Sequence, residues 1–222
     1  MSDDFPRAAV RDALVSGLEE QALQADAPVD ALIDYLALLH RWNRAFNLSA
    51  VRDPLEMVHR HIMDSLAVLP YVDGSRLLDV GSGPGLPGIP LALVRPDIAV
   101  TLLDSNGKKT RFLRQAATEL GLADVEIVHE RTERWSVTPG FDTIISRAYA
   151  RLDTFVDQAG RLLAPGGTML AMKGRFDARE ETTGLPEGWH YQVIPVTVAG
   201  LSAARCLVRV CRQGTASGED HG

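Results

Sequence analysis

Apolar side chains recur at two different spacings along this chain, and the change between them falls near residue 73. In the first part, Leu32, Leu36 and Leu39 are three or four positions apart, and a similar stripe runs from Val58 to Leu66. This is the spacing of a buried helix face. Beyond residue 73, short apolar runs alternate with helical patterns. We therefore predict a helical N-terminal region over 1–72 and an α/β core over 73–212.

Seven strands are expected in the core, each a short apolar run bounded by turn residues. The runs lie at 76–80, 99–104, 125–129, 141–146, 168–172, 191–198 and 205–211. Helices are expected at 108–120, where Gly121 ends the helix, and at 152–163. Strands that alternate with helices predict a mostly parallel sheet with helices on both faces. Ligands of such sheets bind beyond the carboxyl ends of the strands, where the strand order reverses.

Helix starts are predicted at two places in the N-terminal region. Pro28 suits a first helical turn, with Asp26 as its cap. Asp53 precedes Pro54, and Glu56 follows three residues after Asp53, which is a capping-box pattern. At the other end of the chain, the polar residues 213–222 predict a flexible tail.

Composition narrows the class of protein. The chain has 222 residues, of which 45% are hydrophobic and 23% charged, values typical of a globular protein. No apolar run reaches the roughly 18 residues of a membrane span, and the acidic first 20 residues do not resemble a signal peptide. Cys206 and Cys211 form neither a disulfide framework nor a zinc pattern, and the histidines lack the spacing of metal ligands. We expect a cytoplasmic, monomeric protein without a metal.

The net charge of −6 is unevenly distributed. Residues 1–34 carry eight acidic residues and two arginines, so the rest of the chain is neutral overall. This balance argues against a protein that coats nucleic acid without sequence preference. The same charge distribution is compatible with RNA binding through a local basic face. Two basic groups could form that face: one holds Arg41, Arg44, Arg52 and Arg60, and the other holds Lys108, Lys109, Arg111 and Arg114.

The strongest local signal is a glycine-rich loop directly after the first predicted strand. Gly81, Gly83, Gly85 and Gly88 follow Asp79, and such a loop lets the backbone approach a ligand closely. An ordinary tight turn needs fewer glycines. The spacing departs from that of dinucleotide sites, and a carboxylate is badly placed beside a pyrophosphate. Asp79 suits a ligand that bears an ammonium and a sulfonium, such as S-adenosylmethionine.

Two further strand ends extend this cofactor site. Asp104 ends the second strand, where a carboxylate can accept both ribose hydroxyls. NAD enzymes use an acid at the same place, and a helix cap or a surface position is the simpler alternative for Asp104. Thr132 and Glu133 follow the third strand, and we expect them to face the adenine. The alternative is a solvated charged loop.

The residues after the fourth strand bear on the kind of methyl transfer. The signature of enzymes that methylate exocyclic amino groups is absent from 145–149, and no cysteine lies near the predicted site. A ring nitrogen such as guanine N7 carries no proton and needs no general base. Arg147 lies beside the expected methyl group, where it could contact guanine, phosphate or the cofactor carboxylate, or form a surface ion pair. Lys173 ends the fifth strand and could contact phosphate or simply be solvated.

Several strings together resemble one family. They are 46–53, 60–66, 79–90, 103–105, 108–113, 146–148 and 173–174, of which the two at 60–66 (RHIMDSL) and 83–90 (GPGLPGIP) are the most specific. The chain resembles the bacterial small-subunit rRNA guanine-N7 methyltransferases, also called the glucose-inhibited division protein B family. The resemblance implies a Rossmann-like methyltransferase core with a helical N-terminal extension, S-adenosylmethionine as cofactor, and N7 of one guanine in 16S rRNA as acceptor.

The resemblance also implies roles for individual residues. It assigns cofactor contacts to Gly81, Leu86, Thr132, Glu133 and Arg147. Because Arg131-Thr132 departs from the usual family pattern, we expect the Thr132 contact to be made by its backbone. The cofactor set is then Asp79, Gly81, Gly83, Gly85, Leu86, Asp104, Thr132, Glu133 and Arg147, with Arg147 also the catalytic candidate.

Candidate RNA contacts are Arg60, His61, Lys108, Lys109 and Lys173, and the expected partner is 16S rRNA or the small ribosomal subunit. Arg60 can also pair with Asp64 on one helix face, so a role in helix packing is as well supported for this string. Three alternatives to the family function stay open. They are a methyltransferase acting on another RNA, one acting on a protein or a small molecule, and a non-catalytic ribosome-binding protein.

Overall fold

The computed structural model describes residues 5–23, 27–147, 149 and 151–213. Asp26, the predicted helix cap, and residues 214–222 of the predicted tail lie outside these ranges. Six helical segments precede the sheet. They are α1 (Arg7–Glu20), α2 (Val29–Phe46), α3 (Pro54–Met57), η1 (Val58–Met63), α4 (Asp64–Leu66) and η2 (Leu69–Tyr71).

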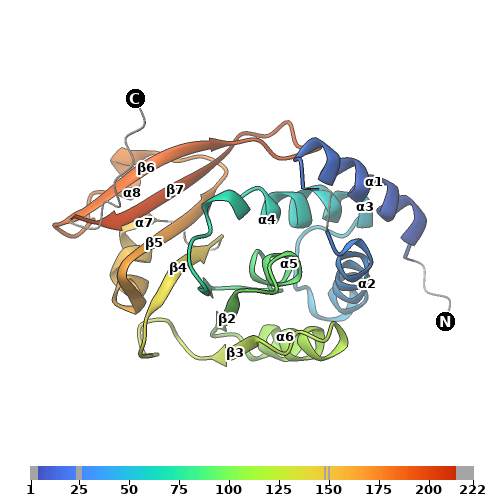
Figure 1. Ribbon diagram of the computed structural model, residues 1–222, viewed down its shortest axis with the longest axis horizontal. Coiled ribbons are helices and arrows are strands. Elements are labelled where there is room, and N and C mark those ends of the chain that lie inside the picture. Colours follow the sequence, from blue (N-terminus) through green and yellow to red (C-terminus); the bar gives the residue numbers. More distant parts are fainter. Residues whose placement is uncertain (1–4, 24–26, 148, 150, 214–222) are drawn as a thin grey trace.

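One seven-stranded sheet forms the core (Figure 1), as predicted. Its strands lie in the order β3 (Val125–His129), β2 (Ala99–Asp104), β1 (Arg76–Val80), β4 (Phe141–Ser146), β5 (Leu163–Lys173), β7 (Arg205–Arg212) and β6 (Trp189–Val196). The first five are mutually parallel, and β7 is antiparallel to both β5 and β6. The strand β5 begins five residues before the predicted position, because Leu163 already pairs with Phe141 before a register shift.

Helices cover both faces of the sheet, which agrees with the predicted fold class. The N-terminal helices, α5 (Gly88–Val94) and α6 (Gly107–Glu119) pack on one face. The helix α7 (Leu152–Ala159) packs on the other and continues into η3 (Gly160–Leu162), and α8 (Ala178–Glu181) follows β5. Side chains alternate between these two cores along each strand: Leu77 joins the first core and Leu78 the second. Among the described residues, no helix is long and apolar enough to cross a membrane.

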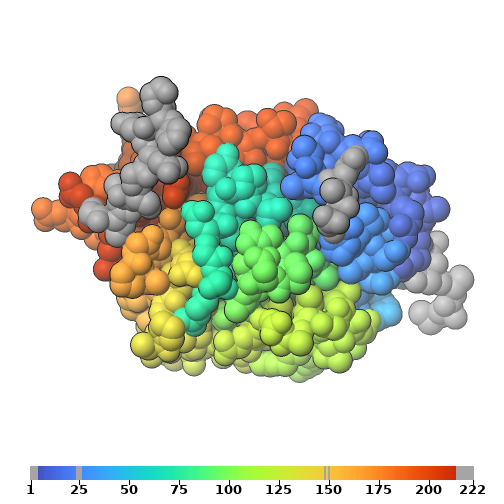
Figure 2. Space-filling view, viewed as in Figure 1, coloured from blue at the N-terminus to red at the C-terminus, as the bar shows by residue number. Residues whose placement is uncertain are grey.

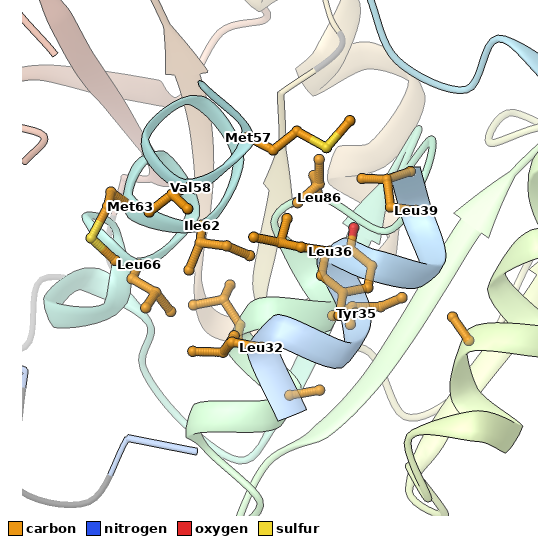
Figure 3. Packing of buried hydrophobic residues seen from close by; sticks show 14 of the residues in the cluster. Leu32, Tyr35, Leu36, Leu39, Met57, Val58, Ile62, Met63, Leu66 and Leu86 are labelled. Carbon is orange, nitrogen blue, oxygen red and sulfur yellow. The ribbon is translucent and has the colours of Figure 1, made fainter. Parts of the chain in front are cut away.

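The N-terminal helices share a hydrophobic core with the sheet. Figure 3 shows Leu32, Leu36 and Leu39 of α2 facing the segment from Met57 to Leu66. Leu86 of the glycine-rich loop packs between them. In Figure 2 the blue N-terminal helices lie directly against the green segment that carries α5. The predicted region 1–72 is therefore a structural layer over the sheet, and its helices help to hold the loop in place.

The helix that begins after Asp53 departs from the expected form. The Asp53 carboxylate accepts hydrogen bonds from the amides of Leu55 and Glu56, both at 2.9 Å, so the predicted cap is confirmed. The stripe then passes through a π-helical turn at η1. Wider turns of this kind are rare and often occur at functional sites. The turn carries His61 and leads directly to Asp64, two residues of the 60–66 string.

Candidate active site

The strand order reverses between β1 and β4, whose parallel carboxyl ends lie side by side. The Ser146 hydroxyl donates a 2.7 Å hydrogen bond to the Val80 carbonyl and ties the two strand ends together. The glycine-rich loop leaves β1 at this point, and Arg147 directly follows β4. This is the place where sheets of this type bind ligands.

The amides of the glycine-rich loop are all engaged by the chain itself. The amides of Gly81 and Ser82 donate to the Leu103 carbonyl at 2.8 and 3.2 Å, and that of Gly83 donates to the Asp104 carboxylate at 2.9 Å. Internal acceptors also hold the amides of residues 85, 86, 88 and 89, and residues 84 and 87 are prolines without an amide hydrogen. A pyrophosphate site needs amides that point at the ligand. This loop therefore does not have the hydrogen-bond donors of a dinucleotide site.

Asp79 presents a buried carboxylate behind this loop. Its Oδ2 accepts the Gly88 amide at 2.9 Å, while its Oδ1 is buried without a hydrogen-bond partner. Burial raises the pKa of Asp79 to about 7, against the opposing effects of the Gly88 amide and the Arg147 charge. A cationic group nearby would favour the ionised form and supply what Oδ1 lacks. Asp79 is fully buried, so its match to the expected ammonium is one of charge and not of open access.

The predicted loop residues fall into two groups. Gly81, Gly83 and Gly85 all have positive φ, which favours glycine. At Gly83 an added Cβ would lie 3.9 Å from the Gly81 carbonyl oxygen and from Lys109 Nζ, which is ordinary van der Waals contact, so the positive φ and not a lack of space favours glycine there. At Gly85 it would lie 2.5 Å from the Cδ1 of Ile89, which makes Gly85 a packing position. The Leu86 side chain is buried in the core, so a cofactor contact by Leu86 is open to its backbone alone.

Asp104 lies in a cleft of about 300 Å³ at the carboxyl ends of β2 and β3. Its two oxygens accept the amides of Gly83 at 2.9 Å and Asn106 at 2.8 Å, and Lys109 Nζ lies 3.7 Å away. Asn106 rather than Asp104 caps α6. Because a carboxylate offers about four acceptor positions, Asp104 can shape the loop and still accept a ribose hydroxyl.

Thr132 and Glu133 line the same cleft, as does Gly81, so these predicted cofactor residues come together. We predicted a cofactor contact by the Thr132 backbone. Its carbonyl accepts a hydrogen bond from the Arg161 guanidinium, so this contact would fall to the Thr132 amide. The Thr132 hydroxyl accepts a 3.2 Å hydrogen bond from the Tyr149 hydroxyl. Burial raises the pKa of Tyr149, which keeps its hydroxyl a donor.

We call a second cavity, of about 380 Å³, the acceptor cavity. It lies beside the cleft, because Lys173 of its lining donates a 2.8 Å hydrogen bond to the carbonyl of Tyr149, which lines the cleft. Arg147 reaches it from β4, Lys173 from β5 and Arg205 from β7, while His61 and Asp64 reach it from the N-terminal helices. Arg147 donates to the Arg60 carbonyl at 3.1 Å and to Asp64 Oδ2 at 3.4 Å. The string at 60–66 therefore holds Arg147 in place. Asp64 pairs with Arg147 and not with Arg60, whose partner is Glu56.

The predicted RNA contacts differ in what surrounds them. His61 is buried against the Ser49 hydroxyl at 2.8 Å, and burial lowers its pKa to about 4. Lys173 is buried and pairs with Glu181 at 2.7 Å. Because Glu181 already compensates its charge, Lys173 is less suited to bind a phosphate than the sequence indicated. Arg60 and Lys108 are exposed on the surface.

Three functional candidates escaped the sequence analysis. Arg205 binds Asp64 at 2.9 Å in the acceptor cavity. The buried Tyr35 hydroxyl donates to the Pro84 carbonyl at 2.8 Å and fixes the glycine-rich loop from α2. Tyr149 lines the cofactor cleft. Of these three residues, only Tyr35 could have been recognised from the sequence, because its hydroxyl lies within an otherwise apolar helix stripe. No group of residues suited to a metal ion occurs in the described part of the chain.

Residues 29–208 match the family model described as GidB, rRNA small subunit methyltransferase G. The chain belongs to this family. A protein named Ribosomal RNA small subunit methyltransferase G from Alkalilimnicola ehrlichii is 57% identical over 175 residues, which cover 78% of this chain and 79% of that protein. A protein of the same name from Stenotrophomonas maltophilia is 47% identical over 211 residues, which cover 95% of this chain and 99% of that protein.

The fold of this rRNA small subunit methyltransferase G family member is shared with more distant proteins. The crystal structure of a SAM-dependent methyltransferase from Aquifex aeolicus superposes with a TM-score of 0.58. The two chains are 18% identical, and the match covers 74% of this chain and 96% of that one. At this identity the likeness concerns the fold alone. The predicted family and the predicted methyltransferase fold are both confirmed.

Proposed function

We propose that this chain transfers the methyl group of S-adenosylmethionine to N7 of a guanine in 16S rRNA of the small ribosomal subunit. The observation that carries the proposal is the glycine-rich loop, whose amides are all engaged internally while Asp79 Oδ1 lies buried and unpaired behind it. This arrangement disfavours a pyrophosphate and favours a cationic donor. The names of the family and of its relatives support rRNA as the acceptor.

The residues of the cleft divide the work of binding the cofactor. Asp79 would attract the ammonium group, Asp104 the ribose hydroxyls, and Thr132 and Glu133 the adenine. The bound cofactor supplies a methyl group on a positively charged sulfur. The protein has mainly to align donor and acceptor, because effective alignment alone contributes much of the acceleration of such a displacement. Arg147 lines the acceptor cavity at the end of β4, beside the start of the glycine-rich loop, and would fix this alignment.

The acceptor cavity also suits a nitrogen that carries no proton. His61, the one imidazole that lines it, has a pKa of about 4 and is held by Ser49. A general base works best with a pKa near the working pH, so His61 is poorly suited to remove a proton. Guanine N7 attacks with a lone pair and requires no such base.

The direct test incubates the purified protein with cofactor labelled in the methyl group and with small-subunit particles or their RNA. The labelled nucleotide is then mapped by mass spectrometry. Label at guanine N7 supports the proposal. Label on another base, on another guanine atom or on protein, or no label at all, contradicts it. A parallel series at rising salt separates RNA docking, which weakens steeply as counterions compete, from action on a neutral small molecule.

A further inference from the structure

A single carboxylate joins two arginines in the acceptor cavity. Asp64 Oδ1 accepts a 2.9 Å hydrogen bond from Arg205 Nε, and Oδ2 accepts one of 3.4 Å from Arg147 Nη1. The Asp64 side chain is 7% exposed, whereas those of Arg147 and Arg205 are 26% and 24% exposed. The carboxylate is therefore enclosed, while both guanidinium groups reach the surface of the cavity.

The charges of the cavity do not cancel. Lys173 pairs with Glu181 at 2.7 Å, and Arg60 lies 3.7 Å from Glu56. Two arginines and one carboxylate then remain in the cluster of Asp64, Arg147 and Arg205, which carries one net positive charge. A partly buried charge is costly unless a partner compensates it. A phosphate diester of an RNA strand carries one negative charge and would compensate this one.

The two arginines occupy different sides of Asp64. Arg147 follows β4, whose carboxyl end lies beside that of β1, where the glycine-rich loop begins. Arg205 begins β7, two strands farther from the loop. Asp64 and the Ala204 carbonyl engage two of its five donor positions in the described part of the chain. The other N–H donors of the planar Arg205 guanidinium are well suited to bind phosphate oxygens.

We propose that Arg205 binds a backbone phosphate of the acceptor strand, and that Asp64 is the positioning residue that holds Arg205 next to Arg147. The inference rests on the proposed function, since it takes the acceptor to be RNA. In this arrangement the strand is anchored on one side of Asp64 while the cofactor is aligned on the other. Arg205 would thus fix the acceptor nucleotide relative to the methyl group.

The test compares Arg205→Gln with Arg209→Gln. Arg209 lies on the same strand and also pairs with an aspartate, Asp73 at 3.5 Å, but it lies outside the acceptor cavity. Methyl transfer to the RNA and cofactor binding are measured for both variants and for the wild type over a range of salt concentrations. We expect Arg205→Gln to raise the KM for RNA about tenfold. The slope of log affinity against log salt should fall by about 0.7, the value for one phosphate contact on a single strand.

Cofactor affinity of Arg205→Gln should stay within about twofold of the wild type, and Arg209→Gln should resemble the wild type throughout. A raised KM with an unchanged salt slope would show that Arg205 contacts the base, and this would overturn the phosphate assignment. An Arg205→Gln protein that behaves like Arg209→Gln would overturn the inference but leave the proposed function intact. A wild-type protein that does not methylate the RNA would instead defeat the proposed function itself.

The role of Asp64 is tested by combining substitutions. Asp64→Asn keeps the shape of the side chain but removes the charge that holds both Arg205 and Arg147. The KM for RNA should rise through the loss at Arg205, and kcat should fall through the loss at Arg147. If Asp64 acts through Arg205, then adding Asp64→Asn to Arg205→Gln should raise the KM for RNA little further, because coupled residues are not additive. Fully additive effects of the two substitutions on this KM would contradict the positioning role.

Discussion

The cofactor cleft and the acceptor cavity lie side by side but are built in different ways. The cleft is assembled from consecutive strand ends, mostly within residues 81–133, and its loop is shaped by backbone hydrogen bonds. The acceptor cavity draws on segments as far apart as residues 49 and 206, and side-chain ion pairs hold it together. Local sequence thus determines the first site, whereas the second exists only once the N-terminal helices have packed on the sheet.

The two sites also differ in charge. The unpaired carboxylate oxygen of Asp79 lies behind the cofactor loop, while Arg147 and Arg205 reach the surface of the acceptor cavity. Asp79 is fully buried, but the cleft itself is lined by more carboxylates than cations: Asp104, Glu130 and Glu133 against Lys109 and Arg131. A cationic donor would therefore meet a net negative lining, and an anionic strand would meet the two arginines. Arg147 lines the acceptor cavity and directly follows β4, next to the strand from which the glycine-rich loop begins.

The largest effect is expected from Asp104→Ala, which should weaken cofactor binding by more than about 100-fold. The substitution removes the acceptor for the Gly83 and Asn106 amides as well as the predicted ribose contact, and charge-assisted hydrogen bonds contribute about 1.5–3 kcal/mol each. Titration calorimetry with the cofactor measures the change. Asp97→Ala is the matched control, since Asp97 is exposed and pairs only with Arg95 in the described structure. Retained affinity in Asp104→Ala would refute the assignment.

Arg147→Ala is expected to reduce kcat by about 100-fold, since misplacement near the reacting atoms has effects of this size. The KM values for cofactor and RNA then assign Arg147 to one of the two sites. A larger rise in the KM for cofactor would place Arg147 with the cleft, and a larger rise for RNA would place it with the acceptor cavity. Arg95→Ala serves as the control for loss of a paired arginine. Activity within threefold of the wild type would remove Arg147 from the catalytic site.

His61 should make the acceptor side less stable in acid. Its pKa is about 4 in the folded protein, because burial and the Arg147 charge disfavour protonation, against an ordinary value of 6.5. The unfolded chain therefore binds the proton more readily, and stability is lost as the pH falls from about 6.5 toward 4. At pH 5 the loss is about 2 kcal/mol.

Urea unfolding at pH 7 and pH 5 measures this contribution as a difference between proteins. Asp79 acts in the opposite direction, because a raised folded pKa stabilises the protein as the pH falls. The pH dependence of wild-type stability therefore contains the contributions of both His61 and Asp79. The contribution of His61 is the difference between the wild type and His61→Gln. The exposed His190 provides the control variant His190→Gln. Equal pH dependence in the wild type and His61→Gln would contradict the assignment.

The same contrast explains what the sequence could predict. All seven strands, the Asp53 cap and the glycine at the end of α6 follow from local patterns, and Gly121 indeed has a φ of +65°. The predicted residues Gly81, Asp104, Thr132 and Glu133 line one cleft because strand ends of a parallel sheet meet at one edge.

Pairings between distant segments could not be predicted in this way. Asp64 meets arginines 83 and 141 positions away, and nothing in the local sequence specifies either distance. For the same reason the sequence left a phosphate contact and a solvated strand end open for Lys173, whereas its side chain is buried and its ammonium pairs with Glu181. The π-helical turn that delivers His61 and Asp64 to the cavity follows an apolar stripe that also fits a regular helix.

The smallest effect, and the most direct test of the cofactor side, is the pH dependence of cofactor affinity. Below its pKa of about 7 the Asp79 carboxyl is protonated in the protein without cofactor. A cationic ligand favours the ionised form, so binding should release a proton. The affinity should weaken by up to about tenfold for each pH unit below 7 and level off above it.

Calorimetry at pH 6, 7 and 8, in buffers of different ionisation enthalpy, measures both the affinity and the released proton. Asp79→Asn keeps the size of the side chain but cannot ionise, so its cofactor affinity should be weaker and independent of pH over this range. Asp73→Asn changes an exposed carboxylate just before the same strand and should behave like the wild type. An affinity that does not vary with pH in the wild type would mean that Asp79 is not the group facing the cation. The unpaired oxygen would then be a feature of the glycine-rich loop and not of the cofactor site.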